Sequence, residues 1–162
     1  MDAAVVGLVG AGVGAGLGFA GSYVGQRRED RRQLWQCRAE AFGRMVGAVF
    51  QVRSVVVTRT DPRTDRPTRT DFEDRIRSAY AEVLQGYARS VLLSGSEATT
   101  TAIAELREAT ALLVEGCLEH GVFETSNGRP SGNPDFVRLR EVLVTSEAQM
   151  QRQLRLPVAP AH

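Results

Sequence analysis

An uncharged stretch near the start of the chain ends abruptly in a cluster of arginines. No residue from Ala3 to Gln26 carries a formal charge, and a helix needs roughly 20 apolar residues to cross a bilayer. The basic residues that follow are Arg27, Arg28, Arg31 and Arg32. Because positive charges favour the cytoplasmic side, the pattern predicts a single-pass cell-membrane protein, with an anchor over 3–25 and a cytoplasmic C-terminal domain. These arginines also suit anionic lipid headgroups, although Glu29 and Asp30 partly offset their charge.

The glycines of the predicted anchor follow one another at intervals of three and four residues. This glycine stripe consists of Gly7, Gly10, Gly14, Gly18, Gly21 and Gly25. On an α-helix the spacing marks a single face, and small residues four apart let two membrane helices approach closely. The stripe therefore predicts a homo-oligomer, or packing against another membrane protein. The alternative is that glycine replaces leucine through the codon usage of a GC-rich genome, which the absence of lysine also indicates.

Beyond the anchor, the apolar residues recur with the period of amphipathic helices. The pattern predicts an all-α domain over 26–156, followed by a flexible tail over 157–162. Its helices are expected at about 27–57, 71–93, 97–119 and 134–155. Four such helices joined by short-to-moderate loops form an antiparallel bundle most economically. Two alternatives stay open: a short strand at residues 55–57, and a bundle that closes only by pairing between chains.

The apolar face of each expected helix gives its candidate core residues. In the first helix these are Leu34, Cys37, Ala41, Met45, Ala48, Val52 and Val55, widened by Trp35, Phe42, Val49 and Val56. In the second they are Phe72, Ile76, Ala79, Val83, Tyr87 and Val91, widened by Tyr80 and Leu84. The third and fourth helices contribute Ile103, Leu106, Thr110, Leu113, Cys117, Phe136, Leu139, Leu143, Ser146, Met150 and Leu154. Capping signals are expected at Thr70, within 94–97, and at Asn133 before a proline.

Reactive residues do not occur in the spacings that catalysis or metal binding requires. The two histidines, His120 and His162, belong to no ligand motif, and the two cysteines lie far apart. The outer glutamates of the third helix, which are Glu105, Glu108, Glu115 and Glu119, are expected to be solvated. The sequence therefore predicts a protein that is not an enzyme. No catalytic, cofactor-binding or metal-binding residue is assigned, and no cofactor is expected.

Two segments carry features that other functions would use. Residues 10–15 fit the G-x-G-x-x-A pattern of dinucleotide sites, but no later segment supplies the strands of a parallel sheet. The motif match leaves a membrane-bound nucleotide-dependent enzyme as a third hypothesis for function, and the missing strands rank it below the other two. The net charge is +1, and the arginines of residues 59–69 alternate with aspartates. Direct nucleic-acid binding is not expected from such a balanced charge.

The layout of the chain resembles a group of small actinobacterial membrane proteins. The resemblance rests on the anchor GLVGAGVGAGLGFAGSYVGQRR and on the helical segment WQCRAEAFGRMV. Together with an arginine-rich and alanine-rich helical domain, these segments are similar to the KilB-like proteins of conjugative plasmids. The resemblance implies a role in plasmid spread between hyphal compartments, at the membrane beside a separate DNA-translocating ATPase. It carries over no catalytic residue.

The leading hypothesis is a membrane-anchored accessory or scaffolding protein that acts through protein–protein contacts, in conjugative plasmid transfer or spread. The alternative is a membrane-coupled signalling or regulatory module, in which one continuous helix passes tilt or rotation to the bundle.

Overall fold

The computed structural model describes residues 3–60, 67–120 and 130–155, with side chains from residue 29 onward except at positions 120 and 131. Its elements are α1 (Ala3–Thr60), α2 (Arg69–Leu93), α3 (Glu97–His120), a 3-10 turn η1 (Pro130–Gly132) and α5 (Pro134–Leu154). The chain divides into two compact units, residues 1–37 and 38–162. The first unit contains the beginning of α1, and the second contains the rest of the chain.

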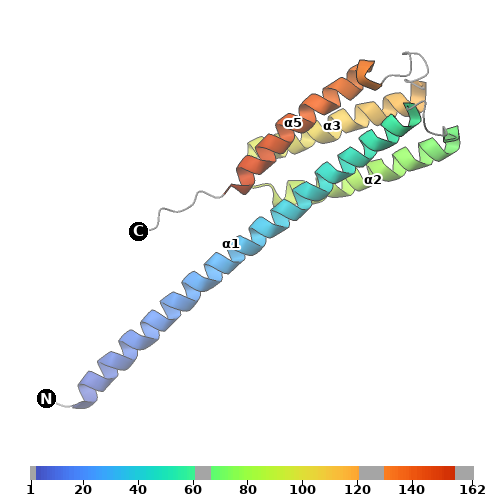
Figure 1. Ribbon diagram of the computed structural model, residues 1–162. Helices are drawn as coiled ribbons and strands as arrows, with labels where there is room; N and C mark the ends of the chain where they lie inside the picture. Colours follow the sequence, from blue (N-terminus) through green and yellow to red (C-terminus); the bar gives the residue numbers. More distant parts are fainter. Residues whose placement is uncertain (1–2, 61–66, 121–129, 156–162) are drawn as a thin grey trace. The chain divides into compact units, whose positions relative to one another are not determined.

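The second unit is an antiparallel four-helix bundle, which confirms the all-α prediction for this part of the chain. The part of α1 from residue 38 onward, α2, α3 and α5 run side by side in alternating directions (Figure 1). The predicted helix bounds agree with the observed ones to within two residues in α2, α3 and α5. Residues 55–57 continue α1 as helix, so the strand alternative for this segment is wrong.

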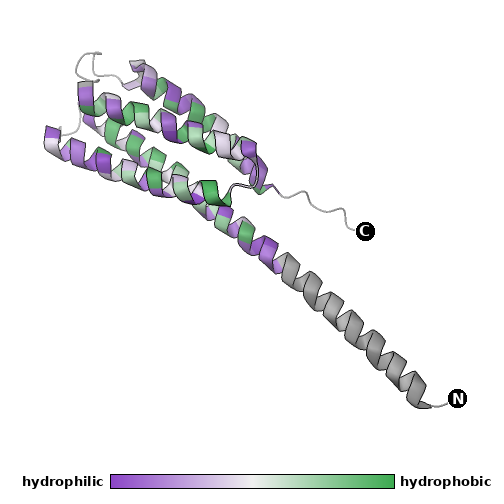
Figure 2. Ribbon diagram, turned by 180° about the vertical axis from the view of Figure 1, so that it is seen from behind, coloured by the Kyte–Doolittle hydropathy of each residue, from purple (hydrophilic) through white to green (hydrophobic). Residues whose placement is uncertain are grey.

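A single apolar core fills the bundle, and all four helices contribute to it. Hydrophobic and hydrophilic stretches alternate along the helices of the bundle (Figure 2). Every predicted core residue of α3 is buried, and so is every predicted core residue of α5 except Leu154, which is half-buried against the core. One polar bond crosses the α3–α5 interface, where the buried Ser146 hydroxyl donates to the carbonyl oxygen of Ala102 at 2.9 Å. The predicted faces of α3 and α5 are therefore confirmed.

The predicted face of α1 begins too early in the sequence. Leu34, Trp35 and Cys37 are exposed instead of buried, and full burial starts at Ala41. Arg38, the first residue of the bundle unit, donates from Nε to the carbonyl oxygen of Leu93 at 2.8 Å. This bond satisfies a carbonyl at the end of α2, where helical carbonyls lack partners within the helix. The part of α1 that faces the core therefore begins after Arg38.

The predicted face of α2 is also partly wrong in its second half. Gly86 and Ser90 are buried there, whereas Tyr87 is only half-buried and Leu84 is exposed. A Cβ atom added to Gly86 would lie 2.8 Å from the Cα of Met45, closer than real side chains come. The small residue is required because the backbones of α1 and α2 approach each other at this point.

The observed caps explain where α2, α3 and α5 begin. The Thr68 hydroxyl accepts from the Asp71 backbone N–H at 3.1 Å, so the cap lies two residues before the predicted Thr70. Ser96 caps α3 in the same way, through the N–H of Thr99 at 3.2 Å. Asn133 Oδ1 accepts from two backbone N–H groups of α5, at 2.8 and 3.1 Å, ahead of the expected proline. The Asn133 cap is thus confirmed.

Candidate functional site: a groove between α1 and α2

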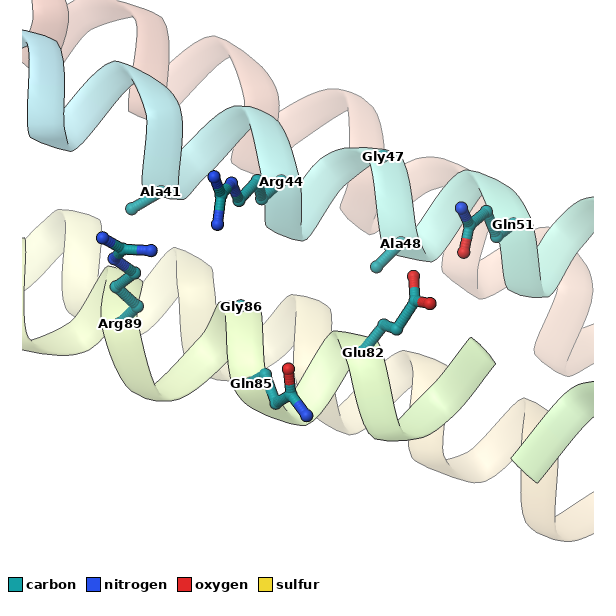
Figure 3. A pocket seen from close by; sticks show the side chains of 9 residues that line it. All are labelled: Ala41, Arg44, Gly47, Ala48, Gln51, Glu82, Gln85, Gly86 and Arg89. Atoms are coloured by element: carbon teal, nitrogen blue, oxygen red, sulfur yellow. The ribbon is translucent and has the colours of Figure 1, made fainter. Parts of the chain in front are cut away.

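An open groove with a volume of about 510 Å³ lies between α1 and α2, and another hollow of about 550 Å³ lies between α3 and α5. The lining residues of the groove are Ala41, Arg44, Gly47, Ala48, Gln51, Glu82, Gln85, Gly86 and Arg89 (Figure 3). A smaller hollow of about 320 Å³ shares Gln51 and Glu82 with it and adds Arg75. We call the groove and this smaller hollow together the α1–α2 groove. They form one continuous surface along the two helices.

Small side chains create the floor of the α1–α2 groove. Ala41 and Ala48 are buried on α1, and Gly86 faces them from α2. At Gly47 an added Cβ would meet no described atom within 4 Å, so this position faces open space. The close approach of the two backbones at Gly86 brings the longer polar side chains to the rim. The result is a shallow floor between polar walls.

The walls of the α1–α2 groove carry more positive than negative charge. Three arginines, Arg44, Arg75 and Arg89, stand against one carboxylate, that of Glu82. Arg44 and Arg89 come from facing helices and lie toward one end of the groove, with Glu82 toward the other (Figure 3). Arg44 also pairs with Glu40 at 2.6 Å, but both side chains are more than half exposed. Such an exposed pair contributes little and leaves the arginine available to a ligand.

A second polar feature lies between α1 and α5. The guanidinium of Arg53 stands over the rings of Phe50 and Phe136, 5.5 and 5.4 Å from their centroids. Its Nε atom is buried and finds no hydrogen-bond partner among the described residues. Phe50 is 47% exposed although it is aromatic. Cation–π contacts of this kind contribute about 0.5–1 kcal/mol each at exposed sites, so we interpret this cluster as a brace between the two helices.

Burial controls the chemistry of one of the two cysteines. Cys117 is buried in the core, and this burial, with a smaller effect of the nearby Asp135 charge, raises the pKa of its thiol from 9.0 to about 12. A thiol with so high a pKa offers almost no thiolate near neutral pH. Cys37 is exposed on α1. The two thiols therefore differ in accessibility.

We expect alkylation of the native protein at about pH 8 to modify Cys37 and to spare Cys117. The buried thiol must become accessible before it can ionise and react, so Cys117 should be labelled only in denaturant. Peptide mass spectrometry after iodoacetamide treatment, with and without denaturant, measures both sites. Equal labelling of the two cysteines in the native protein would contradict the burial of Cys117.

The raised pKa of Cys117 also predicts that the free energy of unfolding falls above about pH 9, where the thiol of the unfolded chain ionises and the thiol of the folded chain does not.

Potential metal ligands are scattered over the described part of the bundle. Within residues 29–60, 67–119 and 130–155, no group of three or more histidine, cysteine, aspartate or glutamate side chains could hold a metal ion together. The glutamates of α3 are exposed, as expected.

The residues singled out in the anchor are only partly covered by the structure. The surroundings of the glycine stripe and the side chains of Arg27 and Arg28 lie outside what the structure describes, as does the tail 157–162. Arg31 and Arg32 are described and exposed, and neither lines the α1–α2 groove. Across the side chains that are described, no helix offers a stretch both long and apolar enough to span a bilayer. The predicted anchor over 3–25 falls outside that range and stays a prediction.

The α1–α2 groove was missed at the level of sequence. Its arginines look like ordinary solvated positions, and its floor consists of alanine and glycine, which contribute little to an apolar pattern. A signal was present in the pair Gly43 and Gly47, four residues apart on α1. Both are exposed and face open space in the bundle.

Comparisons with protein families, with curated proteins and with solved structures find no match to this chain.

Proposed function

We propose that this protein is a membrane-anchored, non-enzymatic accessory or scaffolding protein that works through protein–protein contacts. The observation that carries the proposal is the α1–α2 groove, which is open and has arginines reaching over it from both helices. Its polar groups are guanidinium, amide and carboxylate groups, which bind and orient a partner by hydrogen bonds and charge. Its length along two helices suits a protein segment better than a small molecule.

The membrane part of the proposal rests on the sequence. The uncharged run of residues 3–26 forms the anchor, and the four arginines after it hold the bundle in the cytoplasm. The glycine stripe packs against a second copy or against another membrane helix. The likeness to KilB-like proteins supports conjugative plasmid transfer or spread as the process.

Cys37 offers a direct test of this arrangement, because it is exposed and follows the predicted anchor. We expect the full-length protein to float with membranes and to resist extraction by carbonate. A membrane-impermeant maleimide should label Cys37 only after the membrane is opened, since the bundle faces the cytoplasm. A Cys37→Ser variant controls for labelling elsewhere. Recovery of the protein in the soluble fraction would overturn the anchor, and labelling in intact cells would reverse the topology.

One observation favours the alternative, a membrane-coupled signalling module. α1 is assigned as one helix from Ala3 to Thr60, with residues in both units. Each residue inserted into a helix adds about 100° of rotation and 1.5 Å of rise. Insertion of two alanines after Arg32 should abolish a signalling function while membrane attachment is retained. A scaffold should tolerate the same insertion in a partner-capture assay.

A further inference from the structure

The exposed face of α3 carries a concentration of negative charge. Four glutamates, a threonine and a leucine recur along it at intervals of three and four residues: Thr101, Glu105, Glu108, Leu112, Glu115 and Glu119. All are exposed except Leu112, which is half-buried. The one arginine of α3, Arg107, is half-buried with its guanidinium 5.6 Å from the ring centroid of Tyr87. We call these six residues the acidic face. Thr101 and Glu105, at its N-terminal end, share a hollow with Arg152 of α5.

The acidic face and the α1–α2 groove are complementary in charge and belong to different parts of the same bundle. We propose that the acidic face of one copy docks into the α1–α2 groove of a second copy. The proposal rests on the proposed scaffolding function, which it deepens by naming the partner and both contact surfaces. Charge complementarity of this kind fixes register and excludes wrong partners more than it adds affinity.

The spacing of charges on α2 matches the spacing on α3. Arg75, Glu82 and Arg89 follow one another at steps of seven residues, and so do Glu105, Leu112 and Glu119. Each set spans about 21 Å at 1.5 Å per residue. If the partner's α3 runs antiparallel to α2, Arg89 faces Glu105 and Arg75 faces Glu119. Glu82 is the one acidic residue of the groove walls, and a carboxylate opposite it would repel it. In this register Glu82 faces Leu112 instead.

The same register works on α1. The contact between Met45 and Gly86 and the bond between Arg38 and Leu93 give the register of α1 against α2. From these contacts, Arg44 lies at the level of Glu108 of the partner, and Gln51 lies at the level of Glu115. Leu112 then lies above the floor near Gly47 and Ala48, where an added Cβ on the glycine meets open space. Each glutamate thus faces a hydrogen-bond donor, and the apolar residue faces the small ones.

The direction of the helices in this arrangement agrees with membrane attachment. Because α1 and α2 are antiparallel, an α3 that is antiparallel to α2 runs parallel to α1. Within each bundle α3 also runs parallel to α1, so α1 has the same direction in both copies. Copies anchored in one membrane require this common direction. The contact joins two different surfaces, so each copy can use both and the assembly grows into a ring or an open row.

A disulfide cross-link tests the register in the full-length protein in its own membranes. One tagged chain carries Gln51→Cys and a differently tagged chain carries Glu115→Cys, both with Cys37→Ser. We expect an oxidant to join the two chains. The matched control replaces Glu115→Cys with Glu141→Cys, at an exposed glutamate of α5 outside both surfaces, and should give no product above background. Absence of the Gln51–Glu115 product would overturn the proposal.

Charge reversal then tests the complementarity. With Arg44→Glu and Arg89→Glu in both chains, or with Glu105→Arg and Glu108→Arg in both, like charges meet and the yield should fall about tenfold or more. With the groove reversal in the Gln51→Cys chain and the face reversal in the Glu115→Cys chain, opposite charges meet again and the yield should recover. Recovery also shows that both variants fold. Failure of the mixed pair to recover would overturn the proposed contact.

Flotation of the same samples separates this proposal from the proposed function. If the protein floats with membranes but gives no cross-link, the proposed membrane function stands and the proposed self-contact is wrong. If the protein forms the cross-link but does not float, the proposed self-contact stands and the proposed anchor is wrong.

Discussion

Replacing Gly86 with alanine should lower the free energy of unfolding by about 1–3 kcal/mol, the usual cost of overpacking a well-packed site. The added methyl group would lie 2.8 Å from the Cα and 3.0 Å from the Cβ of Met45. These atoms belong to, or are attached directly to, the backbone of α1, so no side-chain rotation can relieve the clash. The two helices must move apart, which also changes the floor of the α1–α2 groove. Urea denaturation followed by circular dichroism measures the loss.

Gly43 provides the matched control on α1, because an added Cβ there meets no described atom within 4 Å. Gly43→Ala should raise the free energy of unfolding by about 0.5–1 kcal/mol, since alanine loses less conformational entropy than glycine in a helix. Opposite signs for the two substitutions would support the close approach at Gly86. A stabilising effect of Gly86→Ala would show that α1 and α2 are not in contact there.

Replacing Leu106 with alanine should lower the free energy of unfolding by about 2–5 kcal/mol. Its side chain is fully buried in the shared core. The substitution removes apolar contacts and leaves a cavity that the surrounding helices can fill only in part. The same denaturation experiment measures this change.

Leu92 is the matched control for the core, because the residue type is the same and its side chain is 84% exposed. Leu92→Ala should change the free energy of unfolding by no more than about 0.5 kcal/mol, as substitutions at exposed positions usually do. Equal losses at the two positions would contradict the placement of α2 and α3 in the bundle.

The sequence predicted some helix faces better than others, for a physical reason. In α3 and α5 the buried positions are held by large apolar residues, so the periodic pattern and the core coincide. In α2 the pattern failed where helices approach most closely, because Gly86 and Ser90 fill buried positions without apolar bulk. Leu34 and Trp35 continue the period of α1, but the period alone does not say how far the neighbouring helices extend.

The α1–α2 groove could not be predicted from sequence, since it depends on the register between two helices. Several contacts join the two helices, among them the close approach of Gly86 to Met45 and the hydrogen bond from Arg38 to Leu93. Arg44 and Arg89 are far apart in sequence and line the same cavity because α1 and α2 pack side by side. The glutamates of α3 were correctly expected on the surface, but the complementary surface became visible only with the fold.

The hydrogen bond from Ser146 to Ala102 has a consequence for how uniquely the bundle is specified. Apart from this bond, α3 and α5 meet through the apolar core, to which both helices contribute large side chains. Apolar contacts of this kind are non-directional. If α5 slid by one turn, the buried hydroxyl would lose its acceptor, and an unsatisfied buried hydroxyl costs about 1–3 kcal/mol. The bond therefore adds a directional preference for the observed register of α5 against α3.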